Sequence, residues 1–175
     1  TGRAYALASS EGSSAIGLHL GDDVDGGVVV GGRLLQGERG SVGAFAHLAV
    51  DVEGRPCVCG KSGCLDSYAS VRGIEATTGR GLVSTPSSLI TQSGMMVARA
   101  CASLAAMMDI QRIRIGGVVV EAFRETFIES IQDELAERTR LTHLKHLDVC
   151  VAQLHVLAGA SAVALAADSS CLDTA

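Results

Sequence analysis

Residues 47–68 read HLAVDVEGRPCVCGKSGCLDSY, and the interpretation of the whole chain starts from this stretch. It contains one imidazole and three thiols, from His47, Cys57, Cys59 and Cys64. The first two thiols are one residue apart, so an extended backbone places both on the same side. Gly60 and Gly63 then supply the turn flexibility that returns the third thiol to the other two. The sequence therefore predicts that the four side chains meet.

Three thiols and an imidazole form the ligand set of a closed structural zinc site, in which four ligands surround the ion as a tetrahedron. A disulfide, or simply a group of buried thiols, is the alternative interpretation. Cysteines one residue apart do not readily bond each other, and pairing two of three leaves an odd thiol. We therefore predict zinc held by these four residues, with His47 contributed by a neighbouring strand.

The composition limits the class of protein. A chain of 175 residues can bury one hydrophobic core. Aromatic residues make up only 3% of it, so Ala, Val, Leu and Ile must build that core. The net charge of −5 argues against a nucleic-acid surface, because duplex binding needs clustered Lys and Arg. The longest apolar run, residues 156–167, is shorter than the ~20 residues of a membrane span, so no membrane association is expected.

We recognise no secretory signal, and the chain begins at Thr1 rather than Met, which suggests a fragment of a longer protein. Three cysteines lie outside the zinc motif, Cys101, Cys150 and Cys171, and the first two have apolar neighbours. Such neighbours are typical of buried thiols in a reducing compartment. These observations predict a cytoplasmic location.

Short apolar runs separated by Gly and Asp predict antiparallel strands over residues 14–21, 26–35 and 45–50. Further strands are predicted over 111–117 and 146–154, and helices over 64–76, 88–108, 121–140 and 155–167. Hairpin strands followed by alternating helices and strands predict an α/β fold. It is a mixed sheet with an N-terminal antiparallel hairpin part, helices packed on it and a zinc-stapled loop.

The motif Cys57-Val58-Cys59-Gly60-Lys61-Ser62-Gly63-Cys64-Leu65-Asp66, preceded by Gly43, Phe45 and His47, resembles the signature of the ROK family of repressors, open reading frames and sugar kinases. The segments 31–43 and 115–123 also resemble that family, the second matching its glycine-rich adenosine-proximal turn. The resemblance implies an actin-like ATPase (ribonuclease H-like) lobe. Residues 1–175 would form a single ROK C-terminal domain, without the N-terminal lobe or any DNA-binding domain.

The chain departs from the family at the nucleotide site. Where ROK kinases have a Thr-Gly-x-Gly-x-Gly hairpin around the ATP phosphates, residues 22–27 read DDVDGG. We call residues 22–25 the acidic turn. Its three carboxylates repel a phosphate chain, and its side chains block close approach of the backbone. A bound cation there lacks the further ligands of a calcium loop, so an exposed acidic turn is expected. Val118 also replaces a glycine of the later turn.

The chain also departs from the family at the sugar site. Ala44 and Ala46 replace the Glu and the Gly of a Glu-x-Gly-His stretch. Loss of this glutamate removes a charge-assisted hydrogen bond to a sugar hydroxyl, worth about 1.5–3 kcal/mol. His47 remains, and Asp66 stands where the family has a glutamate. The resemblance therefore implies His47 and Asp66 as the ligand-binding residues.

From these departures we expect the sugar-sensing and dimerisation domain of a ROK-type transcriptional regulator with a degenerate ATP site, and no enzyme activity. No residue is assigned a catalytic role. The expected partners are a sugar or sugar-phosphate effector, a second copy in a homodimer or higher homo-oligomer, and DNA through an N-terminal domain absent from this chain. One alternative is a fragment of a ROK sugar kinase of the glucokinase or N-acetylmannosamine kinase type. Another is an interaction module that binds no ligand.

Overall fold

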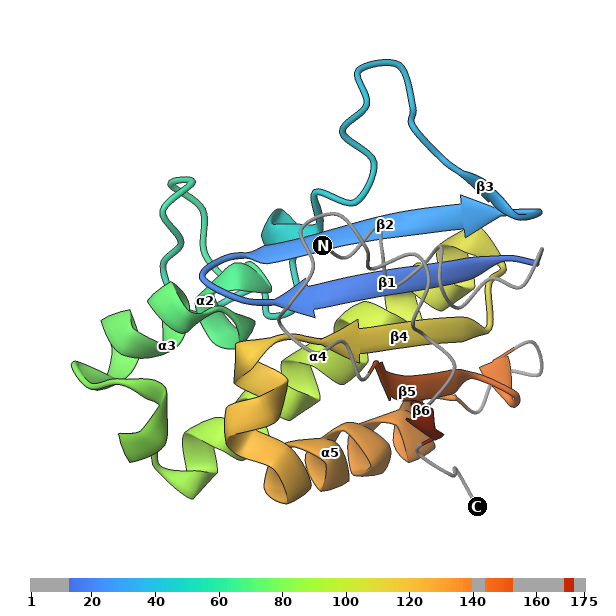
Figure 1. The fold of residues 1–175 in the computed structure, drawn as a ribbon. Helices are drawn as coiled ribbons and strands as arrows, with labels where there is room; N and C mark the ends of the chain where they lie inside the picture. The colour runs from blue at the N-terminus through green and yellow to red at the C-terminus, as the bar shows by residue number, and fades with distance from the viewer. Residues whose placement is uncertain (1–12, 140–143, 153–168, 172–175) are drawn as a thin grey trace.

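The computed structural model describes residues 13–139, 144–152 and 169–171, the last three as backbone only (Figure 1). The strands are β1 (Ala15–Leu20), β2 (Val24–Val30), β3 (Arg33–Leu34), β4 (Arg112–Gly116), β5 (Asp148–Ala152) and β6 (Ser169–Cys171). The helices are α2 (Asp66–Ala69), α3 (Val71–Thr78), α4 (Ser87–Met108) and α5 (Val118–Arg138), with 3-10 turns η1 (Phe45–His47) and η2 (Leu82–Ser84).

The strands form one mixed sheet in the order β3-β2-β1-β4-β5-β6. Strands β1 and β2 pair antiparallel, as predicted, but a turn at residues 31–32 divides the strand expected over 26–35 into β2 and β3, which also pair antiparallel. β1 pairs parallel with β4, and β4 pairs parallel with β5. Helices α4 and α5 pack against each other and against the central strands (Figure 1). The predicted mixed α/β sheet is therefore confirmed.

The core is aliphatic, as the composition predicts. Fully buried side chains of the sheet include Ile16, Leu18, Ile113 and Ile115, and α4 adds Val97, Ala98 and Ala100. Cys101 is a buried free cysteine, as expected, but Cys150 is disulfide-bonded, so the prediction of a free thiol is wrong there. Of the helices that the structure describes, none has the length and hydropathy of a membrane span.

Two local predictions are wrong. Residues 45–50 form no strand, because Phe45–His47 make a 3-10 turn whose Phe45 ring packs on β2. A Cβ atom at Gly26 would lie 2.2 Å from that ring, so the glycine makes the packing possible. The helix expected over 64–76 is interrupted at Ser70, whose backbone is extended and whose hydroxyl accepts the N–H of Gly73 as the cap of α3.

The remaining elements follow the predicted positions closely. The expected strands over 111–117 and 146–154 appear as β4 and β5, and the helix expected over 88–108 appears as α4. Helix α5 covers the segment predicted from residue 121 onward, with non-helical backbone angles at Arg124. The helix predicted over 155–167 lies outside the described residues.

An ion-pair group joins α4 to α5. Glu134 is 8% exposed and accepts hydrogen bonds from Arg99, at 2.8 Å, and from Arg138. Burial alone would raise the pKa of Glu134, but the hydrogen bonds from the two arginines outweigh it and lower the pKa. The charged carboxylate therefore stabilises the packing of the two long helices.

Glu134→Gln is expected to cost about 1–2 kcal/mol of unfolding free energy at neutral pH. Fully buried pairs cost about 3–5 kcal/mol, and the arginines here reach solvent. Because the folded pKa is lowered, the contribution is present above the ordinary glutamate pKa of about 4.3 and is lost as the pH falls through the folded value. Urea unfolding at about pH 7 and about pH 3 tests this, with the exposed Glu137→Gln as control. An equal deficit at both pH values would contradict the ion-pair explanation.

Candidate metal centre

The candidate ligands are brought together by a compact loop, residues 48–64, which we call the metal loop. Its two ends meet at an antiparallel bridge between Ala49 and Cys64, and Pro56 forms a second bridge with Ser62. Beyond the second bridge, toward the tip of the loop, the N–H of Cys57 donates to the carbonyl of Lys61 at 2.8 Å. This turn folds the second and third thiols back toward the first.

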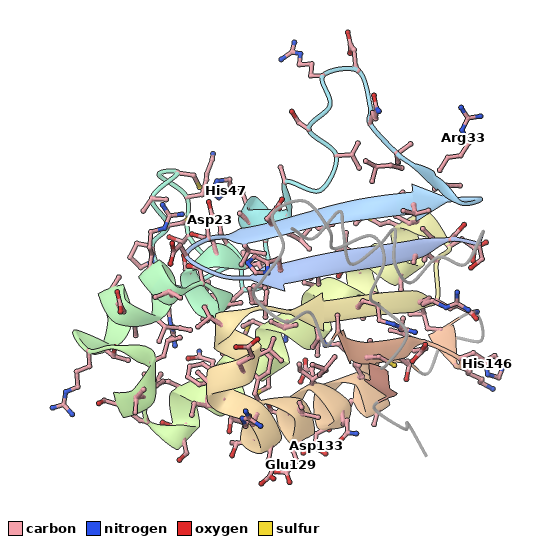
Figure 2. The ribbon with its side chains drawn as sticks, viewed as in Figure 1. Asp23, Arg33, His47, Glu129, Asp133 and His146 are labelled. Atoms are coloured by element: carbon pink, nitrogen blue, oxygen red, sulfur yellow. The ribbon has the colours of Figure 1, made fainter. Side chains whose placement is uncertain are left out.

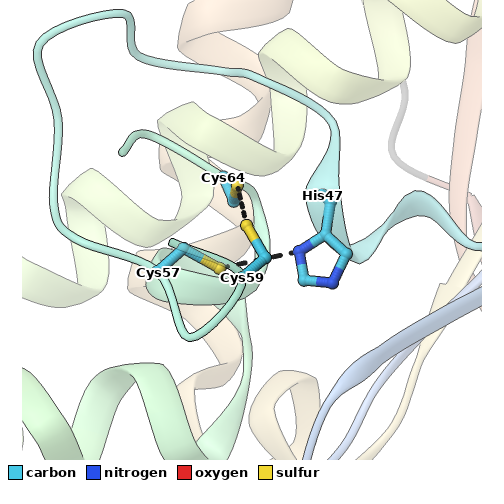
Figure 3. Close-up of side chains that lie close together, drawn as sticks. All are labelled: His47, Cys57, Cys59 and Cys64. Atoms are coloured by element: carbon cyan, nitrogen blue, oxygen red, sulfur yellow. Dashed lines mark hydrogen bonds between the residues drawn. The ribbon is translucent and has the colours of Figure 1, made fainter. Parts of the chain in front are cut away.

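The four predicted ligands converge, as the spacing predicted. One ligand atom from each of His47, Cys57, Cys59 and Cys64 lies within 4.8 Å of all the others. The Sγ atoms of Cys59 and Cys64 are 3.6 Å apart, and the same distance separates Cys57 Sγ from His47 Nδ1 (Figure 3). Sulfurs around a tetrahedral zinc ion with ~2.3 Å bonds lie about 3.8 Å apart, whereas a disulfide needs about 2.05 Å. The cluster has the dimensions of a metal site.

The thiols differ in their acidity. Burial works against the Cys57 thiolate, but hydrogen bonds from Cys59, Cys64 and Ser67 outweigh it and lower the pKa of Cys57 to about 7. Burial raises the pKa of Cys64 to about 12, helped by its hydrogen bonds to the other two thiols. Without a bound ion, Cys57 therefore loses its proton readily, and its negative charge opposes deprotonation of Cys64. A divalent ion would displace the remaining protons, and its affinity would rise with pH.

His47 lies on η1, not on the strand that the sequence analysis expected. Its Nδ1 atom faces the thiols, and the other ring nitrogen points away from them (Figure 3). The side chain is exposed, so this second nitrogen can reach a ligand. A metal on Nδ1 would fix the ring orientation and leave Nε2 for such a contact.

Asp66, the other predicted ligand-binding residue, begins α2 two residues after Cys64 and is 4% exposed. Its Oδ1 atom accepts the backbone N–H of Val24 at 3.0 Å. This carboxylate therefore contacts the first residue of β2, which lies within the acidic turn. Whether it also contacts a sugar stays a prediction.

A second set of contacts supports the metal loop, and sequence reasoning missed it. The Tyr68 hydroxyl donates to Asp51 Oδ2 at 2.8 Å and accepts the backbone N–H of Arg55 at 2.9 Å. The Arg55 guanidinium lies over the Tyr68 ring, 4.5 Å from its centroid, and donates to Gln92 on α4. The one sequence signal for these contacts was Tyr68 itself, an aromatic residue with a hydroxyl group four residues after the last cysteine.

The acidic turn lies at the same end of the sheet as the metal loop. Asp23 and His47 both lie there, with His146 at the opposite end (Figure 2). Asp22 and Asp23 are exposed, and Asp25 Oδ1 accepts the N–H of Gly26 at 2.8 Å. β1 and β4 run parallel, so their carboxyl ends meet at this end of the sheet, where ligands of α/β folds bind.

Val118 and Ala44, the other two positions that differ from the family motifs, lie at this end of the sheet as well. Gly117 links β4 to α5 with a φ of 117°, and a Cβ atom there would lie 2.4 Å from the carbonyl oxygen of Leu20. This close contact brings the start of α5, including exposed Val118, next to the end of β1. Ala44, exposed, directly precedes η1.

The motif, the fold and the converging ligands agree with a comparison against known families. The profile of the ROK family matches residues 2–168. The chain belongs to the ROK family. An N-acetylmannosamine kinase from Citrobacter koseri is 30% identical over 148 residues, covering 76% of this chain and 50% of the relative. An N-acetylmannosamine kinase from Shigella boydii is 32% identical over 136 residues, covering 69% of this chain and 46% of the relative. The chain spans about half the length of these curated relatives.

Solved structures agree on the fold. The ROK hexokinase from Thermus thermophilus superposes with a TM-score of 0.77 at 27% identity, covering 93% of this chain and 60% of the hexokinase. A ROK family transcriptional regulator, a homologue of the Escherichia coli Mlc protein, gives a TM-score of 0.70 at 24% identity, covering 86% of this chain and 46% of the regulator. These neighbours confirm the predicted actin-like ATPase fold.

The comparisons also correct a prediction of the sequence analysis. The acidic turn, Ala44 and Val118 led us to expect a protein without enzyme activity. The curated relatives are named as kinases, and the ROK neighbour with the higher TM-score is a hexokinase. The expectation of a non-enzyme is therefore wrong.

Proposed function

We propose that this chain forms the sugar-facing portion of a ROK sugar kinase that phosphorylates a hexose, with N-acetylmannosamine as the first substrate to test. We further propose that His47, Cys57, Cys59 and Cys64 hold zinc in a structural role. The named kinase relatives support the reaction class, and the three-thiolate, one-imidazole ligand set supports the ion. A cytoplasmic location, where ATP is available, is part of the proposal.

The observation that carries the proposal is the orientation of His47. Its Nδ1 atom is 3.6 Å from Cys57 Sγ, and its other nitrogen points away from the thiols at the exposed end of the sheet. Zinc bound to Nδ1 would fix the orientation of the ring, so that Nε2 could form a hydrogen bond with a sugar hydroxyl. The ion itself would take no part in phosphoryl transfer, because four protein ligands leave no open position.

The acidic turn is compatible with a kinase because part of its charge is balanced. Arg72 Nη2 lies 3.8 Å from Asp23 Oδ2. Asp25 Oδ1 accepts the N–H of Gly26, which uses one of its oxygens within the turn. Arg72 is exposed and can also meet a phosphate group from solvent. The repulsion that the sequence suggested is therefore reduced.

The sugar-sensing domain of a ROK regulator is the second candidate. The acidic turn and Ala44 favour it, because a sensor needs differential ligand binding but no phosphoryl transfer. A homodimer or higher homo-oligomer is part of either proposal. An N-terminal DNA-binding domain belongs to the regulator alone.

Two measurements on the full-length gene product test the proposal. Thermal shift with N-acetylmannosamine, glucose and N-acetylglucosamine tests sugar binding, since a ligand at about 100 times its Kd stabilises by about 2.7 kcal/mol. ADP release with each sugar and Mg-ATP tests the reaction. Sugar-dependent ADP release supports the kinase. Sugar binding without ADP release supports the sensor, and no response to any sugar overturns both.

Ala44→Glu is expected to strengthen sugar binding by about 10- to 150-fold, because it restores an acceptor worth about 1.5–3 kcal/mol. Ala44 is exposed and directly precedes the His47 turn, so the longer side chain has room. Calorimetric titration measures the change. Gln36→Glu adds the same charge at another exposed position and should leave affinity unchanged. Equal affinities of the two variants would place the sugar elsewhere.

A further inference from the structure

The segment that follows the metal loop holds the acidic turn in place. Asp66 Oδ1 accepts the N–H of Val24 at 3.0 Å in a buried hydrogen bond. Its second oxygen, Oδ2, lies 3.8 Å from Arg72 Nη2, the same distance that separates this nitrogen from Asp23 Oδ2. Asp66 therefore contacts the turn through a buried hydrogen bond, and Arg72 contacts it through an exposed ion pair. We call these two residues the latch.

Hydrogen bonds to backbone carbonyls also hold the turn, in addition to the contacts of the latch. The N–H of Val71, the first residue of α3, donates to the carbonyl of Gly21 at 2.9 Å, and Arg72 Nε donates to the carbonyl of Asp22 at 3.1 Å. The start of α3 thus binds both carbonyls at the beginning of the acidic turn. These contacts fix the backbone of the turn as well as its charges.

The latch is joined directly to the metal ligands. Asp66 follows Cys64 by two residues, and the N–H of Ser67 donates to the carbonyl of Cys64 at 3.1 Å. The Ser70 hydroxyl donates to the carbonyl of Asp66 at 2.7 Å, which fixes the other side of the short helix α2. A change in the position of Cys64 would therefore move the carboxylate that holds Val24.

We propose that Asp66 and Arg72 are positioning residues through which metal binding at Cys64 fixes the acidic turn. Asp66 acts on the turn through the hydrogen bond of its Oδ1 atom to Val24, a role separate from the sugar contact that the sequence analysis predicts for it. This inference rests on the proposed function in one respect, because it takes the acidic turn as the phosphate-donor side of the kinase. The metal loop and the turn then act as one unit, and loss of the ion loosens both.

Hydrogen exchange of the zinc-loaded protein tests the latch at the amides of residues 21–26. Asp66→Ala should speed exchange at the Val24 amide about tenfold or more, since a hydrogen bond to a charged group is worth at least that factor. Asp66→Asn keeps an acceptor for this amide and should restore most of the protection. Arg72→Ala should speed exchange in the turn at full zinc content. Arg80→Ala, which removes the same charge from an exposed residue beyond the end of α3, should match the wild type.

The second experiment measures hydrogen exchange after a chelator has removed the zinc. In the wild type, zinc removal should speed exchange in residues 21–26 together with the metal loop. The inference is overturned if chelation opens the metal loop and leaves the turn unchanged, or if Asp66→Ala leaves the Val24 amide protected. It is also overturned if Asp66→Asn weakens sugar binding without any change of exchange in the turn. These readouts need no turnover, so failure of the kinase assay would leave them standing.

Discussion

Cys64→Ser is expected to abolish metal binding. A serine hydroxyl stays protonated near neutral pH and does not replace a thiolate, so three ligands would remain. Cys64 is the most buried of the four, at 3% exposed, and its backbone forms the bridge that closes the metal loop. With free zinc at about 1,000 times its Kd, loss of the site removes about 4 kcal/mol of stabilisation. The sheet should remain folded, because the buried aliphatic side chains of β1, β4 and α4 form its core.

Elemental analysis of the purified protein and thermal unfolding measure the two effects separately. Cys101→Ser is the matched control, because it makes the same chemical change at a buried free cysteine far from the loop. That control should lose some stability, since a buried hydroxyl without a partner costs about 1–3 kcal/mol, but should keep its metal. Wild-type metal content in Cys64→Ser would refute the ligand assignment.

Gly63→Ala is expected to be the most disruptive single-methyl change in the loop. Gly63 has a φ of 73°, and a Cβ atom there would lie 1.5 Å from the carbonyl oxygen of Asp51. The backbone would have to move, and with it the N–H of Val50, which donates to the Gly63 carbonyl at 2.8 Å. We expect a loss of more than about 3 kcal/mol, combining left-handed strain with a steric clash, and a large fall in metal affinity.

Gly60→Ala provides the comparison within the same turn. Gly60 has a similar φ of 84°, but a Cβ atom there meets nothing within 4 Å. Only the strain of the left-handed conformation remains, which costs about 1–2 kcal/mol. Urea unfolding and competition with a chromogenic chelator measure both variants. If the two alanines cost the same, the close contact between Gly63 and Asp51 is not what shapes the loop.

The metal ligands were predictable because their geometry is local. Closely spaced cysteines and glycines keep the thiols near one another, although residues 57–60 form a turn, with the N–H of Gly60 donating to the Cys57 carbonyl at 3.0 Å, and not the extended segment that was expected. Short apolar runs likewise marked the strands β1 and β4, which carry part of the core. Such features depend on residues close together in the sequence.

The features that the sequence analysis missed depend on partners far away in the sequence. Asp66 bonds Val24, which lies 42 residues earlier, so the hydrogen bond that its carboxylate makes within the chain was not foreseen. Phe45 turns away from a strand because its ring packs on Gly26 of β2. The charge of Asp23 was interpreted without Arg72, which lies nearby only in the folded chain. The mistaken expectation of a non-enzyme rested on the acidic turn together with Ala44 and Val118, and comparison with the kinase relatives corrected it.

The packing of Phe45 on Gly26 gives one position of the hairpin a steric requirement. A glycine is needed there to admit the aromatic ring. The neighbouring aspartates at 22 and 23 lie on the outer surface, where side chains can be exchanged without repacking the interior. Substitutions at Asp22 and Asp23 can therefore change the charge of this rim while the packing of Phe45 on β2 is kept.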